Sequence, residues 1–352
     1  MVIFYIFVLI IGLWGVSIRI DKKQYLSKES TNAIKGICIL LVFLRHANQY
    51  VKESGYDYSC FGDYLFLSVD GFLDQLIVIM FLFFSGYGVV CSIQKKGYSY
   101  INSIPKHRVL NTLLNFDVAV FFYIIVALIV GRELSLSNVI LSFFAWESIG
   151  CSNWYIFVIL ICYISTWLVF MIRKIDLDIT KKIVIQIFLI MVFLIIATVF
   201  LVISGKGQWW YNTILVYPLG MFFGIFHKKV EFIVFKGKNY YLIFGACVIL
   251  FLLSWLPHIV SNIHIPGITL VCWILRIVAS IAITIMLMMK FEIGNKFLVW
   301  LGVNLFPLYI YQRLPMILLS TFLTSNPFIL IPVSFGLTCT IVPAFKKFEI
   351  KL

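Results

Sequence analysis

The stretch AIKGICILLVFLRH, residues 33–46, is an apolar run with a lysine near its start and a histidine at its end. Lys35 and His46 are eleven residues apart. At about 100° per residue this is roughly three helical turns, so both side chains lie on one face, about 16 Å apart along the axis. Ionisable residues are costly to keep inside a membrane helix, and they are functional candidates by default.

The composition places this helix in a lipid bilayer. Hydrophobic residues make up 62% of the 352 residues, charged residues only 12%, and the mean hydropathy is +1.04. Soluble domains carry about 25% charged residues. The sequence therefore predicts an all-α integral membrane protein, a polytopic helical bundle. We read the net charge of +13 as membrane topology, with no nucleic-acid partner, because no stretch pairs clustered arginines with a polar phosphate-binding surface.

Apolar segments of about 17–23 residues, long enough to cross a bilayer as a helix, occur about eleven times. We predict spans at 2–18, 34–51, 73–93, 109–131, 154–172, 183–204, 210–226, 240–257, 268–289, 297–319 and 327–343. Residues 134–150 are semi-apolar and could form a re-entrant helix, an interfacial helix or a loop.

Basic residues predict the orientation of the spans. Of the 28 lysines and arginines, 22 lie in alternate segments, within 19–35, 95–108, 173–182, 228–238, 290–296 and 346–351. The other connections, which include 52–72 and 132–153, hold only Lys52, Arg132 and Lys206. The positive-inside rule then puts the N-terminus outside and the C-terminus in the cytoplasm of a multipass plasma or inner-membrane protein. Basic residues follow span 2–18, which favours a retained helix over a signal peptide.

The cysteine and histidine pattern argues against a metal site. The eight cysteines are scattered, with no CxxC pair and no His/Cys cluster at metal spacing. Only Cys60 and Cys151 fall in predicted outer connections, where a disulfide between them is possible. We therefore expect no metal cofactor.

Six short motifs point to one known family. They are Lys35 with His46, Phe83-Phe84-Ser85-Gly86-Tyr87, Lys106-His107-Arg108, Asn153-Trp154-Tyr155, Tyr217-Pro218-Leu219-Gly220-Met221 and Leu301-Gly302-Val303-Asn304-Leu305. Over residues 27 to about 320 the chain resembles the acyltransferase 3 family of multipass membrane acyltransferases. The family core has ten spans. The resemblance thus implies about 11 transmembrane helices, with an added N-terminal helix and linker at 1–26 and an acyltransferase domain at 27–352.

The resemblance also implies an activity, O-acetylation with cytoplasmic acetyl-CoA as the donor. The acceptor would be a hydroxyl of a cell-surface or exported polysaccharide, or of its lipid-linked glycan precursor. His46 matches the catalytic histidine, Lys35 stands where the family has an essential arginine, and Arg108 and Ser85 match motif positions that we assign to donor binding. The chain departs from the family pattern at two positions. Lys35 replaces an arginine, and lysine cannot bind an anion with two parallel hydrogen bonds as arginine does. Gln312 stands where many members have histidine.

The chemistry of the residues agrees with this activity. Transfer to a hydroxyl needs a base, and imidazole is suited to that role near neutral pH. A cation such as Lys35 suits the CoA pyrophosphate or a developing oxyanion. With Lys35 at the cytoplasmic end of its helix and His46 past mid-membrane, the donor could enter from inside and the acceptor from outside. A Cys38 nucleophile is an alternative, although its apolar neighbours favour a plain core thiol.

Other polar residues within spans are candidates for acceptor binding: Arg45, Arg276, Gln312 and Arg313. Arg45 could instead extend to the outer surface, and Arg276 could pair with Asp117 to neutralise a buried charge. On the cytoplasmic side Arg108 shares a helix face with Asn111 and Asn115, which suggests a polar funnel. The positive-inside bias alone also accounts for Arg108.

Two other functions stay open at this point, a glycan-precursor transporter or flippase and a catalytically silent membrane scaffold. Intramembrane charges also suit a transporter, but the sequence has no inverted repeat and no pair of broken helices. An acyltransferase must consume acetyl-CoA, whereas a flippase must not. The sequence sets neither the glycan nor the oligomeric state.

Overall fold

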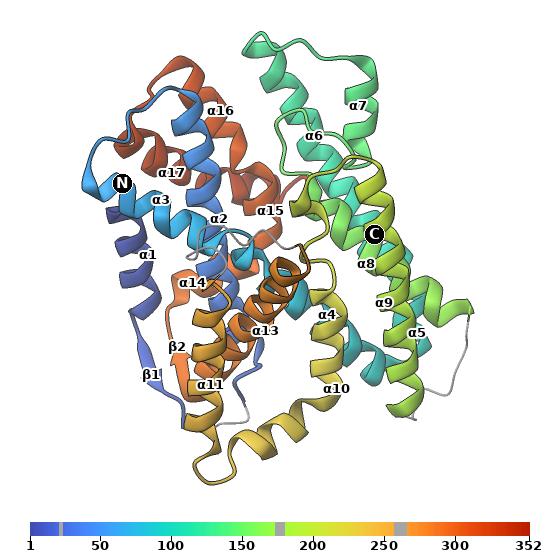
Figure 1. Ribbon diagram of the computed structural model, residues 1–352. Coiled ribbons are helices and arrows are strands. Elements are labelled where there is room, and N and C mark those ends of the chain that lie inside the picture. The colour runs from blue at the N-terminus through green and yellow to red at the C-terminus, as the bar shows by residue number, and fades with distance from the viewer. Residues whose placement is uncertain (21–23, 173–179, 257–265) are drawn as a thin grey trace.

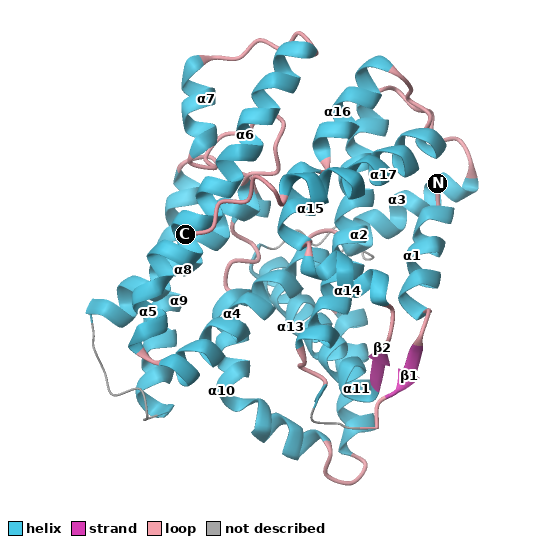
Figure 2. Cartoon of the chain, turned by 180° about the vertical axis from the view of Figure 1, so that it is seen from behind, coloured by secondary structure: helices cyan, strands magenta, loops and turns pink. Residues whose placement is uncertain are grey.

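The computed structural model describes residues 1–20, 24–172, 180–256 and 266–352, and these are almost entirely helical (Figures 1 and 2). The helices of the first half are α1 (Ile3–Leu13), α2 (Lys28–Glu53), α3 (Phe61–Leu73), α4 (Leu76–Lys96), α5 (Tyr98–Ile104), η2 (Pro105–Leu110), α6 (Asn111–Ile129), α7 (Leu136–Phe143) and α8 (Trp154–Ile172). Those of the second half are α9 (Thr180–Ile203), η3 (Gln208–Trp210), α10 (Val216–Val234), α11 (Asn239–Leu253), α13 (Pro266–Lys290), α14 (Lys296–Val303), α15 (Leu305–Tyr311), α16 (Arg313–Phe322) and α17 (Pro327–Phe345). Within the described ranges the only sheet pairs β1 (Val16–Ile18) with β2 (Phe291–Ile293).

By length and composition, six helical segments could cross a membrane, or seven if α10 and α11, which meet at 114°, form one span. The chain is therefore an all-α polytopic membrane protein. Each of the predicted spans overlaps a helix, but α1 has only 11 residues, and α2 is not among the six. The number of crossings thus stays a prediction. Part of the orientation argument rests on Lys22, Lys23, Arg173 and Lys174, which lie outside the described residues.

The segment predicted as one span at 297–319 is not one continuous helix, because the structure divides it into α14, α15 and α16. In a helix interior each backbone N–H donates a hydrogen bond to the carbonyl four residues earlier, and proline has no backbone N–H. Pro307 and Pro315 leave the carbonyls of Val303 and Tyr311 without that bond, and each break follows directly after the carbonyl concerned.

Two other segments differ from their predictions. The connection at 52–72, expected to be a loop, contains most of α3, whose Phe66 is fully buried. The span expected at 210–226 begins later, at Val216, and continues to Val234. Pro218 lies in the first turn of this helix. Proline is tolerated there, because first-turn N–H groups have no hydrogen-bond partner within a helix. Residues 134–150 contain the short helix α7 followed by a loop.

Helix α2 runs through the middle of the bundle, where it contacts α1, α4 and α14–α17 (Figure 1). Its start is fixed by Ser27, whose side chain accepts a hydrogen bond from the backbone N–H of Ser30 at 3.1 Å. Gly55, with a φ of 78°, follows its end. This central position puts α2 against helices from both halves of the chain.

Glycines set the closest helix contacts around α2 and α4. A Cβ at Gly86 on α4 would overlap the carbonyl oxygen of Tyr217, and one at Gly220 on α10 would overlap that of Phe83. In the same way, a Cβ at Gly36 on α2 would overlap a backbone carbonyl of α14, and one at Gly302 on α14 would overlap a backbone carbonyl of α2. Small residues let membrane helices approach closely, so these motif glycines fix the distances between the helices that carry the site.

The two short strands connect the segment before α2 to the second half of the chain. They are antiparallel, with Ser17 opposite Glu292. Arg19, which follows β1, donates hydrogen bonds to the Met288 carbonyl at 3.0 Å and to the Ser30 hydroxyl at 2.9 Å. The buried guanidinium thus joins α13 and the first turn of α2.

Candidate active site

Two cavities lie along α2, one lined by Lys35 and the other by His46. The first, which we name the Lys35 cavity, has a volume of about 560 Å³ and is formed by residues of α2, α4, η2, α6, α8, α14, α15 and the end of α17, with the segment that follows α17. The second, the His46 cavity, measures about 470 Å³ and is formed by residues of α2, α4, the 148–154 segment, η3, α15 and the start of α16. Both volumes lie in the range of small-molecule sites.

The Lys35 cavity is basic. Lys35, His107, Arg108 and Lys346 line it, and Glu349 is the only carboxylate among its lining residues. Lys35 forms no ion pair within the described part of the chain, and its ammonium lies 5.7 Å from the centre of the Phe84 ring. A half-buried cation without a counter-ion favours the binding of an anion.

A π-helical turn brings the second cation into this cavity. Pro105 interrupts the hydrogen-bond ladder between α5 and α6, and Asn111 N–H bonds the Lys106 carbonyl five residues earlier. In this turn Arg108 lies with its guanidinium carbon 5.9 Å from the centre of the Tyr163 ring. Asn111 and Asn115 line the same cavity as Arg108, as the polar stripe suggested.

The segment after α17 closes one side of the Lys35 cavity. The Asn115 side chain holds this segment in place, because its amide donates to the Ile350 carbonyl and its oxygen accepts from the Ile350 N–H, both at 2.9 Å. Lys346, Phe348 and Glu349 thereby become lining residues. No sequence pattern had indicated this contact between residues 235 positions apart.

The His46 cavity contains a buried imidazole among polar side chains. His46 is 7% exposed, and its Nδ1 has no hydrogen-bond partner in the described structure. Arg45 is neutralised by Asp74, its Nη2 donating to the carboxylate at 2.8 Å. Further polar and tryptophan side chains line this cavity: Gln49, Ser148, Ser152, Asn153, Trp154, Trp209 and Arg313.

Arg313 is the second cation of the His46 cavity. Its Nη2 donates to the Gln49 side-chain oxygen at 2.7 Å, one turn along α2 from His46. Unlike Arg45, it has no carboxylate partner within the described ranges. Arg313 is therefore available to an acidic or strongly polar group in this cavity.

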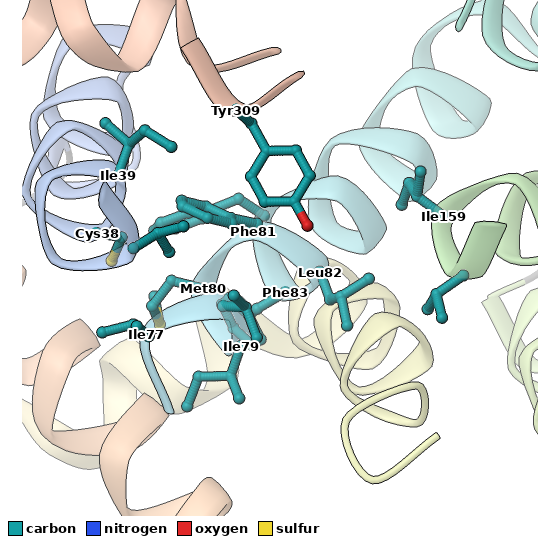
Figure 3. Packing of buried hydrophobic residues seen from close by; sticks show 14 of the residues in the cluster. Cys38, Ile39, Ile77, Ile79, Met80, Phe81, Leu82, Phe83, Ile159 and Tyr309 are labelled. Atoms are coloured by element: carbon teal, nitrogen blue, oxygen red, sulfur yellow. The ribbon is translucent and has the colours of Figure 1, made fainter. Parts of the chain in front are cut away.

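Tyr309 on α15 lines both cavities. The centre of its ring is 6.1 Å from that of His46 and 5.4 Å from that of Tyr155, which lines the Lys35 cavity. Figure 3 shows the ring above Phe81, with its hydroxyl pointing away from α15 and out over α4. Tyr309 was not among the residues selected from the sequence. No local sequence pattern indicated that this tyrosine lies between two cavities.

The remaining sequence candidates fall inside and outside the two cavities. Ser85 lines the Lys35 cavity. Gln312 is buried, donates to the Tyr309 carbonyl at 3.2 Å and lines neither cavity. Arg276 also lines neither. It donates to the Ser254 carbonyl at 2.8 Å and lies 3.5 Å from the centre of the Trp255 ring, so the expected pair with Asp117 is not formed.

The cysteines provide neither a disulfide nor a ligand cluster in the described residues. Cys60 is exposed and Cys151 is buried, and both are free thiols. Cys38 is buried beside Ile39 in the apolar core, as a plain core thiol would be (Figure 3). The described ranges hold no group of three or more His, Cys, Asp or Glu side chains that could bind a metal.

The fold and its polar interior define a polytopic membrane protein with ionisable groups between its helices. A family model described as an acyltransferase domain matches residues 29–346, nearly the whole chain. The chain therefore belongs to the acyltransferase 3 family, which confirms the resemblance carried by its motifs, and it is a membrane acyltransferase. Helix α1 and strand β1 precede the matched range. Comparisons with curated proteins and with solved structures each found no match.

Proposed function

We propose that this acyltransferase moves an acetyl group from cytoplasmic acetyl-CoA to a hydroxyl of a cell-surface or exported polysaccharide, or of its lipid-linked precursor. The observation that carries the proposal is that the two ionisable residues of α2 line different cavities. Lys35, which has no ion-pair partner among the described residues, lines one cavity, the buried His46 lines the other, and both cavities are lined by Tyr309. Such an arrangement suits two substrates that arrive from opposite sides of a membrane.

Charge supports the Lys35 cavity as the donor site. CoA carries a pyrophosphate and a 3′-phosphate, and the cavity offers four basic side chains against one carboxylate. The basic residues at 95–108 and 346–351 belong to the segments that the positive-inside rule assigns to the cytoplasm. Acetyl-CoA would therefore meet this cavity from the compartment in which it is made.

Aromatic and polar side chains support the His46 cavity as the acceptor site. Trp154 and Trp209 offer flat faces on which a sugar ring can stack, and Gln49, Ser148 and Asn153 offer hydrogen-bonding groups for its hydroxyls. Arg313 adds a cation without a carboxylate partner among the described residues. In this orientation the acceptor enters from the outer side.

His46 is the only imidazole that lines the acceptor cavity. In the proposed reaction it takes the proton of the acceptor hydroxyl while that oxygen attacks the thioester carbonyl carbon. The carbon–sulfur bond then breaks, the CoA thiolate leaves, and the proton held by His46 returns to the sulfur. The products are the sugar acetate and free CoA.

The proposal is tested with purified protein in lipid nanodiscs, radiolabelled acetyl-CoA and extracts of the surface glycan as acceptor. Transfer of label into alkali-labile glycan ester, lost in His46→Ala, is the expected result. Mass spectrometry of the glycan from cells with and without the gene checks the same product in place. Movement of a glycan precursor without consumption of acetyl-CoA would instead indicate the transporter, and neither activity would indicate a scaffold.

A further inference from the structure

Tyr309 is the single residue common to the linings of the Lys35 cavity and the His46 cavity. It is 3% exposed, and its ring contacts His46 on one side and Tyr155 on the other. Tyr155 in turn packs edge-on against Phe81, with ring centres 6.0 Å apart, and both line the Lys35 cavity. The aromatic side chain is therefore part of the wall between the two spaces.

The hydroxyl of Tyr309 is buried and makes no hydrogen bond in the described structure. The Ser152 hydroxyl lies near that of Tyr309, but neither oxygen is close and aligned enough with the other to form a hydrogen bond. A buried phenol usually finds a partner, because leaving the group unpaired costs free energy. An unpaired donor at the junction of two cavities is a group that a bound molecule can satisfy.

The short helix α15 holds this tyrosine in place. It is bounded by the breaks at Asn304 and Gln312, and its backbone is tied to α6, where the Tyr123 hydroxyl donates to the Ile310 carbonyl at 2.9 Å. Gln312 bonds the Tyr309 carbonyl at 3.2 Å. The carbonyls of Tyr309 and Ile310 are thus both held by side chains, which limits how far this backbone can move.

We propose that Tyr309 is a catalytic residue that stands where the donor and acceptor cavities meet and donates a hydrogen bond to the oxyanion of acyl transfer. This inference rests on the proposed function. When the acceptor oxygen bonds to the thioester carbon, the carbonyl π electrons move onto the carbonyl oxygen, and the Tyr309 O–H stabilises that charge without giving up its proton. Collapse of this intermediate restores the carbonyl and expels the thiolate.

The positions of the other groups favour Tyr309 for this role. The oxyanion forms where the base meets the acyl carbon, so its donor must lie beside His46 and face the donor cavity. Lys35 is three helical turns away along α2, about 16 Å by helix geometry. Arg313 lines only the His46 cavity. Among these three donors, Tyr309 alone borders the base and both cavities.

The test uses Tyr309→Phe, which removes only the oxygen, and Tyr309→Leu, which also removes the aromatic wall. In nanodiscs we expect Tyr309→Phe to lower kcat about 10²-fold while the KM for acetyl-CoA changes little, the pattern of a group that acts in the transition state. Tyr309→Leu is expected to lose as much transfer and also to hydrolyse acetyl-CoA without acceptor, because water from the His46 cavity reaches the thioester.

The control is Tyr64→Phe, at an exposed position of α3 that lines neither cavity. A wild-type protein with no transfer would refute the proposed function itself. An active wild type with an equally active Tyr309→Phe would overturn the hydrogen-bond role of Tyr309, and a Tyr309→Leu protein with no acceptor-independent hydrolysis would overturn its role as a wall. Thermal unfolding of each variant separates these outcomes from misfolding, and Tyr309→Met replaces the leucine variant if that variant does not fold.

Discussion

Lys35 and His46 belong to the same helix, α2, yet they line different cavities, which share only the side chain of Tyr309. The eleven-residue spacing puts both side chains on one face of that helix, and it also separates them by about half the thickness of a bilayer core. A single helix can in this way present a cation to one substrate and a base to another.

Replacement of His46 by alanine should abolish acetyl transfer while the protein still inserts and folds. Loss of a general base typically costs about 10²–10⁴-fold in rate. The matched control is His227→Ala, on α10, since His227 lines neither cavity. Transfer rates measured on both variants in nanodiscs decide the matter, and near-normal transfer by His46→Ala would remove His46 from the catalytic role.

Replacement of Lys35 by methionine should raise the KM for acetyl-CoA and lower the transfer rate. Lys35→Arg should instead retain or increase the transfer rate. The reason is that the ammonium has no counter-ion in the described structure, and a guanidinium can bind a phosphate with two hydrogen bonds. Arg108→Gln should have a milder effect, since a cation at the cavity mouth mainly raises the local donor concentration.

Lys106→Met is the control for Lys35→Met, because Lys106 lies on the same π-helical turn as Arg108 but is exposed and lines neither cavity. Donor binding is measured by titration of acetyl-CoA against the transfer rate. If Lys35→Met and Lys106→Met behave alike, Lys35 has no specific role in donor binding.

Much of this fold follows from simple patterns in the sequence, because bilayer-length apolar runs and basic connections leave few alternatives. The predicted span at 154–172 coincides with α8. Arg108, Asn111 and Asn115 were also expected on one polar helix face, and all three line one cavity, together with Lys35 of α2. Patterns local to a helix, such as the Arg108 stripe, are readable because helical geometry is fixed.

The failures have physical causes as well. The break at Pro307 and Pro315 was missed because hydropathy does not register a lost backbone hydrogen bond. Tyr309 was missed because its importance comes from its place between two cavities. The helices that form these cavities are far apart in the sequence, so no local pattern marks the residue. Arg276 was assigned to the acceptor from its depth alone, but the Ser254 carbonyl and the Trp255 ring already satisfy it.

The close packing of α4 against α10 gives a prediction about stability. Gly86→Ala should destabilise the protein by about 1–3 kcal/mol, because the new methyl group would meet the Tyr217 carbonyl and force the helices apart. Gly88→Ala, two residues along α4, meets nothing within 4 Å and should be neutral or slightly stabilising, as alanine favours a helix. Thermal unfolding of both variants in the same detergent gives the comparison, and equal stability would refute the packing argument.

The proposed route of acetyl-CoA requires the Lys35 cavity to face the cytoplasm. A single cysteine introduced into a cysteine-free variant at exposed Ser59 or Ser137 should react with a membrane-impermeant thiol reagent added to intact cells. A cysteine at exposed Lys96 or Lys228 should react only after the membrane is opened, because both lie in the basic set of connections. Labelling of the second pair in intact cells would invert the orientation. The Lys35 cavity would then open on the side of the membrane without acetyl-CoA, and the donor assignment of Lys35 would fail with it.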